Sequence, residues 1–306
     1  MANSFKKSWD QFRSSQFFDH YKRSPSAIIA TILIVIIAAL ALLGPYFTPQ
    51  NPFDLSSLDL SNSYLPPLGA GEETVARYGE PNPTYPLGTD QQGRDVFSAV
   101  VYGSRTSLFV GVVGVLLCCA LGTFLGILSG YYGGWLDSLI MRIADIQLSF
   151  PSILIAMFLM SVLGRGIGNV LIALMMVGWV KFARTVRGET LKVRKMEYVD
   201  AARVIGLPNW KIIFKYILPN VTTSLIVLAT MQVGTFILIE ATLSFLGLGV
   251  PITEPSLGML CSDGYKVMFG GLWWVSVFPG LYIVLIVFAV NMLGDFLRDE
   301  LNPKLK

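Results

Sequence analysis

The chain has few charged residues. They make up only 14% of its 306 residues, although soluble domains usually carry about a quarter. Apolar residues make up 53%, which is the composition of a protein built to lie in lipid. The net charge of +3 is too small to indicate a nucleic-acid partner, and no Lys/Arg cluster is interleaved with stacking aromatics. We therefore expect membrane lipid, and no nucleic acid, as a partner.

The residues that metal sites and disulfides need are also scarce. The chain contains one histidine, His20, which excludes a histidine-based metal cluster within it, so we expect no metal site. Its three cysteines give no disulfide framework. Cys118 and Cys119 are adjacent in an apolar run, which favours a packing role, and Cys261 stands alone.

The common catalytic and nucleotide-binding motifs are missing. A P-loop needs Gly-Lys, and this dipeptide does not occur. The sequence has no Rossmann fingerprint, no Cys-x-x-Cys, no His-Glu-x-x-His and no Gly-x-Ser-x-Gly elbow. We therefore expect no catalytic residues and no cofactor in this chain, and any ATP-driven activity needs another chain. The alternative, a membrane enzyme, requires a nucleophile paired with a base within the membrane, and no convincing pair is present.

Long apolar runs predict an all-α membrane protein with six transmembrane helices. The first run, 26–44, has 19 residues and no charge, close to the roughly 20 residues that span a bilayer. A cleaved signal peptide is the competing interpretation, but its apolar core is usually only about 7–15 residues long. We place the first span at 26–47 and the others at about 106–129, 138–163, 168–188, 219–247 and 273–294.

The distribution of Lys and Arg predicts the orientation. With both termini inside, the inner segments hold 18 of the 23 basic residues and the outer segments hold five. An excess of basic residues is typical of cytoplasmic loops. The bias predicts an N-in, C-in topology, with the 189–218 segment and the 296–306 tail in the cytoplasm.

Glycines and prolines within the spans predict local packing. Gly122, Gly126 and Gly130 are spaced four residues apart in the second span, which lets a neighbouring helix approach closely. Pro151 lies inside the third span, and Pro279 lies near the outer end of the sixth. Interior prolines are tolerated where neighbouring helices satisfy the freed carbonyl groups, so the third span is predicted to run through Pro151.

A polar segment between the fourth and fifth spans is the strongest functional candidate. Its first residues suit a helix, with Glu197 and Asp200 at the N-terminal end. Gly206, followed by Pro208, is typical of a helix end. One apolar side of this helix is formed by Val199, Ala202, Val204 and Ile205. Composition alone favours the interpretation that the segment is a solvated loop that only tethers two spans, as most such loops do.

The residue pattern of this segment resembles the cytoplasmic Glu-Ala-Ala loop of binding-protein-dependent ABC importer permeases. It reads Asp200-Ala201-Ala202, then three residues, Gly206 and later Leu218-Pro219. Two residues depart from the pattern: Asp200 replaces Glu and keeps the charge, and Tyr216 stands where the general motif has Ile. Further matches over about 86–304 resemble the C-type subunit of the dipeptide/oligopeptide/nickel branch. These are Gly88-Thr89-Asp90, Gly93 to Val96, Tyr102 to Leu108, Gly130 to Gly134, Met141-Arg142 with Asp145, Leu243 to Gly249, Phe278-Pro279-Gly280, and Asn291 to Asp295 with Leu297-Arg298-Asp299.

The resemblance implies a type I ABC importer transmembrane fold, with its core at 105–295, in a bacterial cytoplasmic (inner) membrane. It implies a homologous B-type permease, two ABC ATPase subunits that hold ATP and Mg, and an extracytoplasmic peptide-binding protein as partners. The implied cargo is a di- or oligopeptide, with nickel or another small solute as the alternative. The implied ATPase-coupling residues are Glu197, Tyr198, Asp200, Ala201, Ala202, Arg203, Gly206 and Leu207.

Two segments outside this core have open interpretations. Residues 1–25 carry Phe5, Trp9 and Phe12 at helical spacing among basic residues, typical of an interfacial helix or of a disordered tail. Residues 48–104 form an unusually long extracytoplasmic loop that is rich in Pro, Gly, Ser and Asn. This loop is either an irregular lid on the outer surface or a contact for the binding protein.

Ionisable residues within spans are candidates for the pathway or for helix packing, since a charge at the bilayer centre costs about 2.5–3.5 kcal/mol. Asp145 lies three residues after Arg142, a spacing that favours a structural ion pair on one helix face. Glu240 has no obvious local partner, so it either lines a translocation cavity or binds a helix of the partner permease. Gln232 is a weaker candidate for pathway lining. A single-chain secondary transporter, the remaining alternative, predicts an internal repeat, and none is visible.

Overall fold

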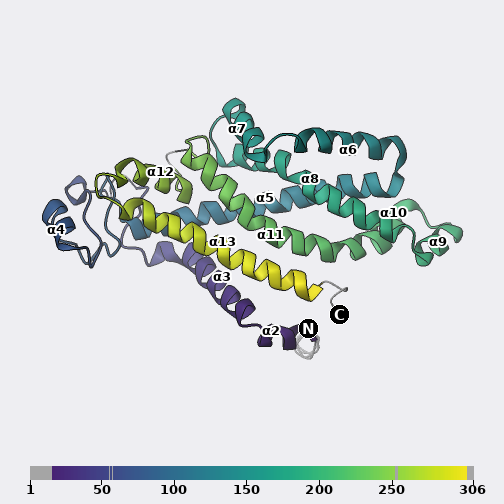
Figure 1. The fold of residues 1–306 in the computed structure, drawn as a ribbon, viewed down its shortest axis with the longest axis horizontal. Coiled ribbons are helices and arrows are strands. Elements are labelled where there is room, and N and C mark those ends of the chain that lie inside the picture. The colour runs from purple at the N-terminus through teal and green to yellow at the C-terminus, as the bar shows by residue number, and fades with distance from the viewer. Residues whose placement is uncertain (1–15, 55, 57, 252–253, 302–306) are drawn as a thin grey trace.

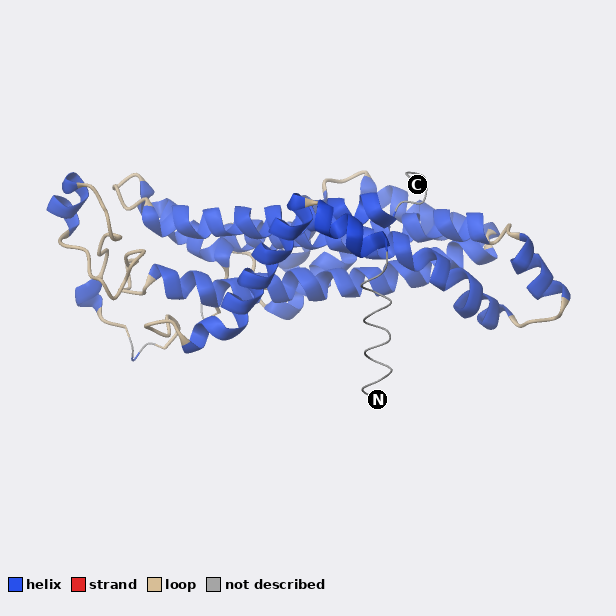
Figure 2. Cartoon of the chain, turned by 90° about the horizontal axis from the view of Figure 1, so that it is seen from below, coloured by secondary structure: helices blue, strands red, loops and turns tan. Residues whose placement is uncertain are grey.

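The computed structural model describes residues 16–54, 56, 58–251 and 254–301. They form an elongated helical bundle, with α4 (Glu72–Tyr78) at one end and α9 (Glu197–Val204) at the other (Figure 1). The described ranges contain helices and loops without a β-strand, which confirms the predicted all-α class, and the loops gather at the two ends of the bundle (Figure 2). The aromatic residues Phe5, Trp9 and Phe12 lie outside the described residues.

Five helices within the described ranges are long and apolar enough to cross a membrane. They overlap five of the six predicted spans, with ends that differ from the expected ones. They are α3 (Pro25–Leu43), α5 (Val96–Tyr132), α8 (Ile167–Val193), α11 (Leu218–Phe245) and α13 (Trp274–Leu301). A short helix, α2 (Gln16–Arg23), precedes them and reaches the end of α13, where His20 Nδ1 lies 2.8 Å from Glu300 Oε2.

The third predicted span is a bent pair of helices. Helix α6 (Gly134–Leu148) and helix α7 (Ser152–Leu163) meet at an angle of 91° and together count as the sixth candidate span. The prediction of a helix running through Pro151 is therefore wrong. Proline has no N–H to donate, and it disfavours the helical conformation of the residue before it, so α6 ends before Pro151 and α7 begins after it.

Helix α5 begins at Val96, about ten residues before the expected start of the second span. Its N-cap is Asp95, whose side chain accepts hydrogen bonds from the backbone N–H groups of Phe97 and Ser98 at 3.3 and 2.8 Å. The helix has 37 residues, which is about 56 Å at 1.5 Å per residue. Because a bilayer core is about 30 Å thick, α5 extends well beyond it.

The glycine stripe of α5 packs against α8, as its spacing predicts. A Cβ atom placed on Gly122 would lie 2.4 Å from the Cβ of Phe182, and one on Gly130 would lie 2.8 Å from the Cβ of Thr190. On Gly126 it would lie 2.6 Å from the carbonyl oxygen of Ala183. Three glycines on successive turns therefore set a backbone separation that no other residue permits.

A further helix, α12 (Leu257–Met268), lies between α11 and α13 and was not anticipated. Its N-cap is Ser256, whose hydroxyl accepts from the N–H of Met259 at 3.2 Å. At 12 residues it is too short to be read as a span. A Cβ atom on Gly264 would lie 2.4 Å from the backbone nitrogen of Ser276, so α12 packs directly on α13.

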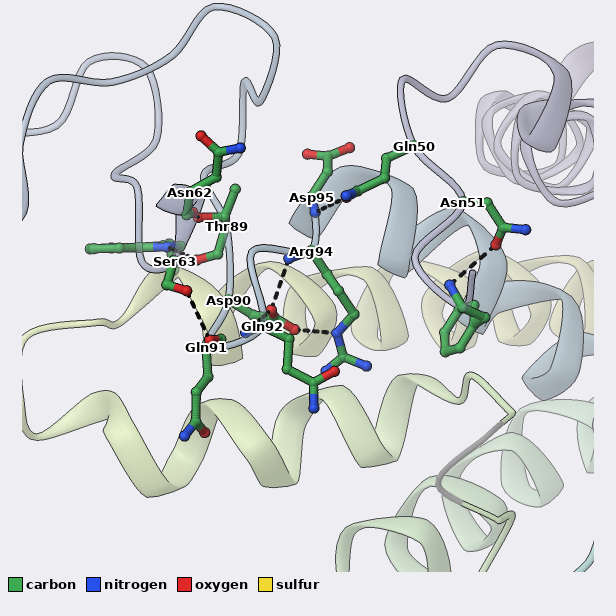
Figure 3. A network of polar contacts seen from close by, with 12 residues as sticks. Gln50, Asn51, Asn62, Ser63, Thr89, Asp90, Gln91, Gln92, Arg94 and Asp95 are labelled. Carbon is green, nitrogen blue, oxygen red and sulfur yellow. Dashed lines mark hydrogen bonds and ion pairs between the residues drawn. The ribbon is translucent and has the colours of Figure 1, made fainter. Parts of the chain in front are cut away.

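The long loop before α5 is held together by buried polar contacts (Figure 3). It contains α4 and two short 3₁₀ turns, η1 (Gly44–Tyr46) and η3 (Leu60–Asn62). Arg94 Nε donates to Asp90 Oδ2 at 2.6 Å, and Gln50 Oε1 accepts from the backbone N–H of Asp95 at 2.8 Å. Both members of the Asp90–Arg94 pair are buried, and buried charges are stable only when they are paired in this way.

This loop packs on the end of the helix bundle. Trp274 Nε1, fully buried at the start of α13, donates to the carbonyl oxygen of Thr89 at 3.1 Å. The Tyr78 hydroxyl of α4 donates to the carbonyl oxygen of Gly270. The loop therefore has the packed arrangement expected of a lid, and we call residues 45–95 the outer cap.

Candidate functional site

Helix α9 lies at the end of the bundle opposite the outer cap (Figure 1). Its first turn carries Glu197 and Asp200, whose negative charges suit a helix N-terminus. Val199 and Ala202 are buried against the chain, whereas Tyr198 and Ala201 face outward. The expected apolar side is therefore divided between the two faces of the helix: Val204 and Ile205 are 86% and 73% exposed. The four apolar residues therefore do not share one side, since Val199 and Ala202 are buried and Val204 and Ile205 are not.

The end of α9 has the hydrogen bonds of a Schellman motif. The N–H of Leu207 donates to the carbonyl oxygen of Ala202 at 3.1 Å, and the N–H of Gly206 donates to that of Arg203 at 2.9 Å. Gly206 has φ +76°, the left-handed conformation that this motif needs. A Cβ atom here would meet nothing within 4 Å, so backbone conformation, and not space, makes glycine the fitting residue.

Side chains fasten α9 to the corner between α5 and α6. Arg203 pairs with Asp200 at 3.0 Å and places its guanidinium 5.7 Å from the ring centre of Tyr131, at the end of α5. The buried Tyr131 donates its hydroxyl hydrogen bond to Asn209 Oδ1 at 2.8 Å. Tyr131 therefore joins α9 and the following turn to the end of α5.

After α9 the chain continues through α10 (Asn209–Ile212) and a π-helical turn, η4 (Ile213–Ile217), into α11. This region exposes large apolar side chains, which we call the apolar tip. The apolar tip consists of Tyr198, Val204, Ile205, Trp210 and Phe214. Exposed lysines border it at positions 195, 211 and 215. An exposed apolar cluster with a polar rim is typical of a protein–protein interface.

Tyr216, which departs from the general motif, lies behind the apolar tip. Its side chain is half-buried, and its ring centre lies 6.1 Å from that of Tyr198. The aromatic ring therefore supports Tyr198 from within the segment. Sequence reasoning did not select Trp210, Phe214 or Tyr131 as candidate site residues. Two large aromatics in a polar loop, spaced four residues apart, were the available signal for the first two.

Asp145 does not pair with Arg142. Its carboxylate accepts from Arg184 of α8, across the interface between the two helices. The predicted pair within one helix is therefore wrong, because α8 offers a longer-range partner to the exposed face of α6. Both members of the observed pair are about half exposed, so it contributes little to stability.

Glu240 is fully buried among α5, α11 and α12, instead of facing a cavity or a partner helix. Its Oε2 accepts from the Ser107 hydroxyl at 2.7 Å and its Oε1 accepts from the Ser244 hydroxyl at 2.8 Å. These contacts give it a helix-packing role within the chain. Gln232 is also buried, and its Oε1 accepts from Lys181 Nζ at 3.3 Å.

Comparison with known proteins agrees with this arrangement. Residues 122–306 match the family described as "Binding-protein-dependent transport system inner membrane component". Residues 7–67 match the "N-terminal TM domain of oligopeptide transport permease C". The chain is 39% identical, over 95% of both chains, to the dipeptide transport system permease protein DppC of Haemophilus influenzae. It is 37% identical to the glutathione transport system permease protein GsiD of Pectobacterium atrosepticum, over 95% of this chain and 91% of that protein.

A solved structure shows the same fold. The structure titled "Inward facing conformations of the MetNI methionine ABC transporter" superposes with a TM-score of 0.55 at 20% identity. The match covers 67% of this chain and 96% of that one. At this identity the likeness supports the type I transmembrane fold alone. With six candidate spans and the family matches, the protein is a multi-pass inner-membrane protein. The chain belongs to the binding-protein-dependent transport system inner membrane components, as a permease subunit of an ABC importer.

Proposed function

We propose that this chain is the C-type permease of an importer for di- and oligopeptides, and that α9 with the apolar tip docks on an ATPase subunit. The observation that carries the proposal is the pairing of an exposed apolar tip with a brace to α5. Val204 and Ile205 offer apolar area to a partner, and Arg203 and Asn209 tie the same segment to Tyr131.

The full importer needs further chains. A homologous B-type permease completes the pathway, and two ATPase subunits bind and hydrolyse ATP with Mg. An extracytoplasmic binding protein delivers the cargo. The support for these partners is the family to which the chain belongs and the lack of a P-loop in its sequence.

In this mechanism, closure of the ATPase dimer moves α9, and the brace at Tyr131 passes that movement to α5. The spans then change between inward-facing and outward-facing arrangements. Such coupling requires that α9 has different contacts in the two states, because a partner with equal affinity for both shifts nothing. Asp200, Ala201 and Arg203 lie on the exposed face of α9, where the contacts with the ATPase form.

A peptide cargo is supported by the relatives, whose names refer to dipeptide, oligopeptide and glutathione transport. Nickel or another small solute is the alternative. Binding measurements between the cognate solute-binding protein and dipeptides, glutathione and nickel decide among them. Tight binding of nickel alone would contradict the peptide assignment.

The docking role is tested by one substitution at each end of the molecule. Ile205→Asp places a charge in the apolar tip, and Leu60→Asp makes the same change at an exposed position of the outer cap. We expect Ile205→Asp to abolish co-purification of the ATPase subunits, and Leu60→Asp to preserve it. Retention of the ATPase by both variants would contradict docking at the tip. Its loss from both would point to failed assembly of the permease.

A further inference from the structure

A polar groove lies between α8, α11 and α13, in the half of the bundle nearer α9. Its volume is about 730 Å³. Its lining includes the polar residues Thr185, Glu189, Asn220, Ser224 and Arg298. We call it the inner groove. Two other cavities of the chain, one beside α3 and one beside α13, are lined almost entirely by apolar residues.

The polar part of the lining of the inner groove is unsuited to lipid chains, although Val227, Leu228, Met231 and Leu301 also line it. Hydroxyl, amide and charged groups on membrane helices face water or protein, because hydrocarbon offers them no hydrogen bonds. The charges at its mouth have both signs, and Glu189 Oε1 lies 2.8 Å from Lys192 Nζ. The lining carries one acidic and two basic residues, Glu189, Lys192 and Arg298, together with hydroxyl groups. Hydroxyls and charges of both signs suit a zwitterionic cargo, which they can contact weakly enough to release.

Lys181, an exposed cation, lies next to the lining residues of this groove without being one of them. Lys181 lies one helical turn before Thr185 on α8, and its Nζ donates to Gln232 Oε1 at 3.3 Å. Gln232 is neutral, 6% exposed, and follows the groove residue Met231. Within the part of the chain that the structure describes, Lys181 forms no ion pair. The carboxylate of Asp145 pairs with Arg184 instead. A carboxylate is the ligand that such an ammonium group favours.

We propose that the inner groove is this chain's wall of the inward-open pathway, and that Lys181 contacts the C-terminal carboxylate of a passing peptide. The inference rests on the proposed function and assigns the contact that cargo makes within it. Gln232 holds the ammonium group beside the groove between passages. Thr185 and Ser224 supply hydroxyl contacts on the way to the cytoplasm.

The experiment places a reporter thiol one turn from Lys181. Thr185→Cys is made in the complete reconstituted importer, and anionic and cationic methanethiosulfonate reagents of similar size are added from the cytoplasmic side. The importer with an unaltered Thr185 is the blank for the chain's own cysteines. We expect reaction without nucleotide, protection in the ATP-trapped state, and a preference for the anionic reagent.

The charge of Lys181 is tested in the same background. Lys181→Gln is expected to lower the ratio of the rate with the anionic reagent to the rate with the cationic reagent about 3- to 10-fold. This is the effect of removing one nearby charge at an intermediate dielectric constant. Arg142→Gln removes a cation from α6, which does not line the groove, and leaves the ratio unchanged. Lys181→Gln also slows peptide uptake per ATP hydrolysed, and Arg142→Gln does not.

Three results would overturn the inference. No thiol reaction in either state means that protein covers the groove. Equal reaction in both states means that the groove lies outside the pathway. An unchanged rate ratio in Lys181→Gln means that this residue does not set the charge of the groove. ATP-driven uptake by the complex with an unaltered Thr185 tests the proposed function separately, since its absence would contradict importer activity itself.

Discussion

Replacing Glu240 distinguishes a packing role from a transport role. Its carboxylate is fully buried and accepts hydrogen bonds from Ser107 and Ser244. Glu240→Ala leaves both hydroxyls without their acceptor, and each unsatisfied buried group costs about 1–3 kcal/mol. We therefore expect a loss of about 2–6 kcal/mol. Glu240→Gln keeps one acceptor oxygen and offers an N–H to the second hydroxyl oxygen, so its loss is about 1 kcal/mol or less.

The measurement is the thermal midpoint of the purified permease complex. At about 2–4 °C per kcal/mol, Glu240→Ala lowers it by about 4–24 °C, and Glu240→Gln by about 4 °C or less. Asp145→Ala is the matched control, because its half-exposed pair with Arg184 is worth at most about 1 kcal/mol.

Two results would refute this reasoning. If Glu240→Gln is as destabilising as Glu240→Ala, the negative charge itself is required and the hydrogen-bond account fails. If Glu240→Ala leaves the midpoint unchanged and abolishes uptake, Glu240 acts in transport and its packing role is minor.

Three further predictions concern other sites. Gly206→Trp is expected to give a membrane-inserted complex whose ATP hydrolysis no longer drives uptake. Gly206→Asn is expected to retain part of the uptake, because Asn tolerates the left-handed conformation. Normal uptake by the Trp variant in reconstituted vesicles would count against this prediction. Gly126→Val forces α5 and α8 apart and costs about 1–3 kcal/mol or more, while Gly168→Ala, which meets no neighbour, leaves the thermal midpoint unchanged. Burial raises the pKa of Asp95, although Ser98 and backbone N–H groups donate to it. The proton on Asp95 therefore stabilises the folded chain at acid pH, and this contribution is lost as the pH rises through the raised pKa. We expect Asp95→Asn to flatten that part of the plot of thermal midpoint against pH.

Hydropathy and charge bias were sufficient to predict most of the spans, because both follow directly from the cost of placing polar groups in lipid. The glycine spacing of α5 predicted a close neighbour, but the identity of that neighbour depends on tertiary packing. The break at Pro151 was missed because a proline within an apolar run is compatible with either a kinked span or two helices. Helix α12 was missed because 12 residues are too few to be read as a span.

The candidate site was predictable in place but not in orientation. The α9 boundaries and the Gly206 cap follow from local residue preferences, and the structure has both. Which side of α9 faces the chain depends on contacts with Tyr131 and Asn209, which are distant in the sequence. Val204 and Ile205 were therefore grouped on one apolar side with Val199 and Ala202, although they face outward.

The uninterrupted length of α5 has a mechanical consequence. It contains no proline, it is anchored at one end by Asp95 of the outer cap, and it is anchored at the other end by Tyr131 beside α9. A continuous helix that is held at both ends cannot shorten. A displacement applied at one end therefore tilts the helix and also moves its other end. The two faces of the membrane are thereby linked along a single piece of secondary structure, without relay through a loop.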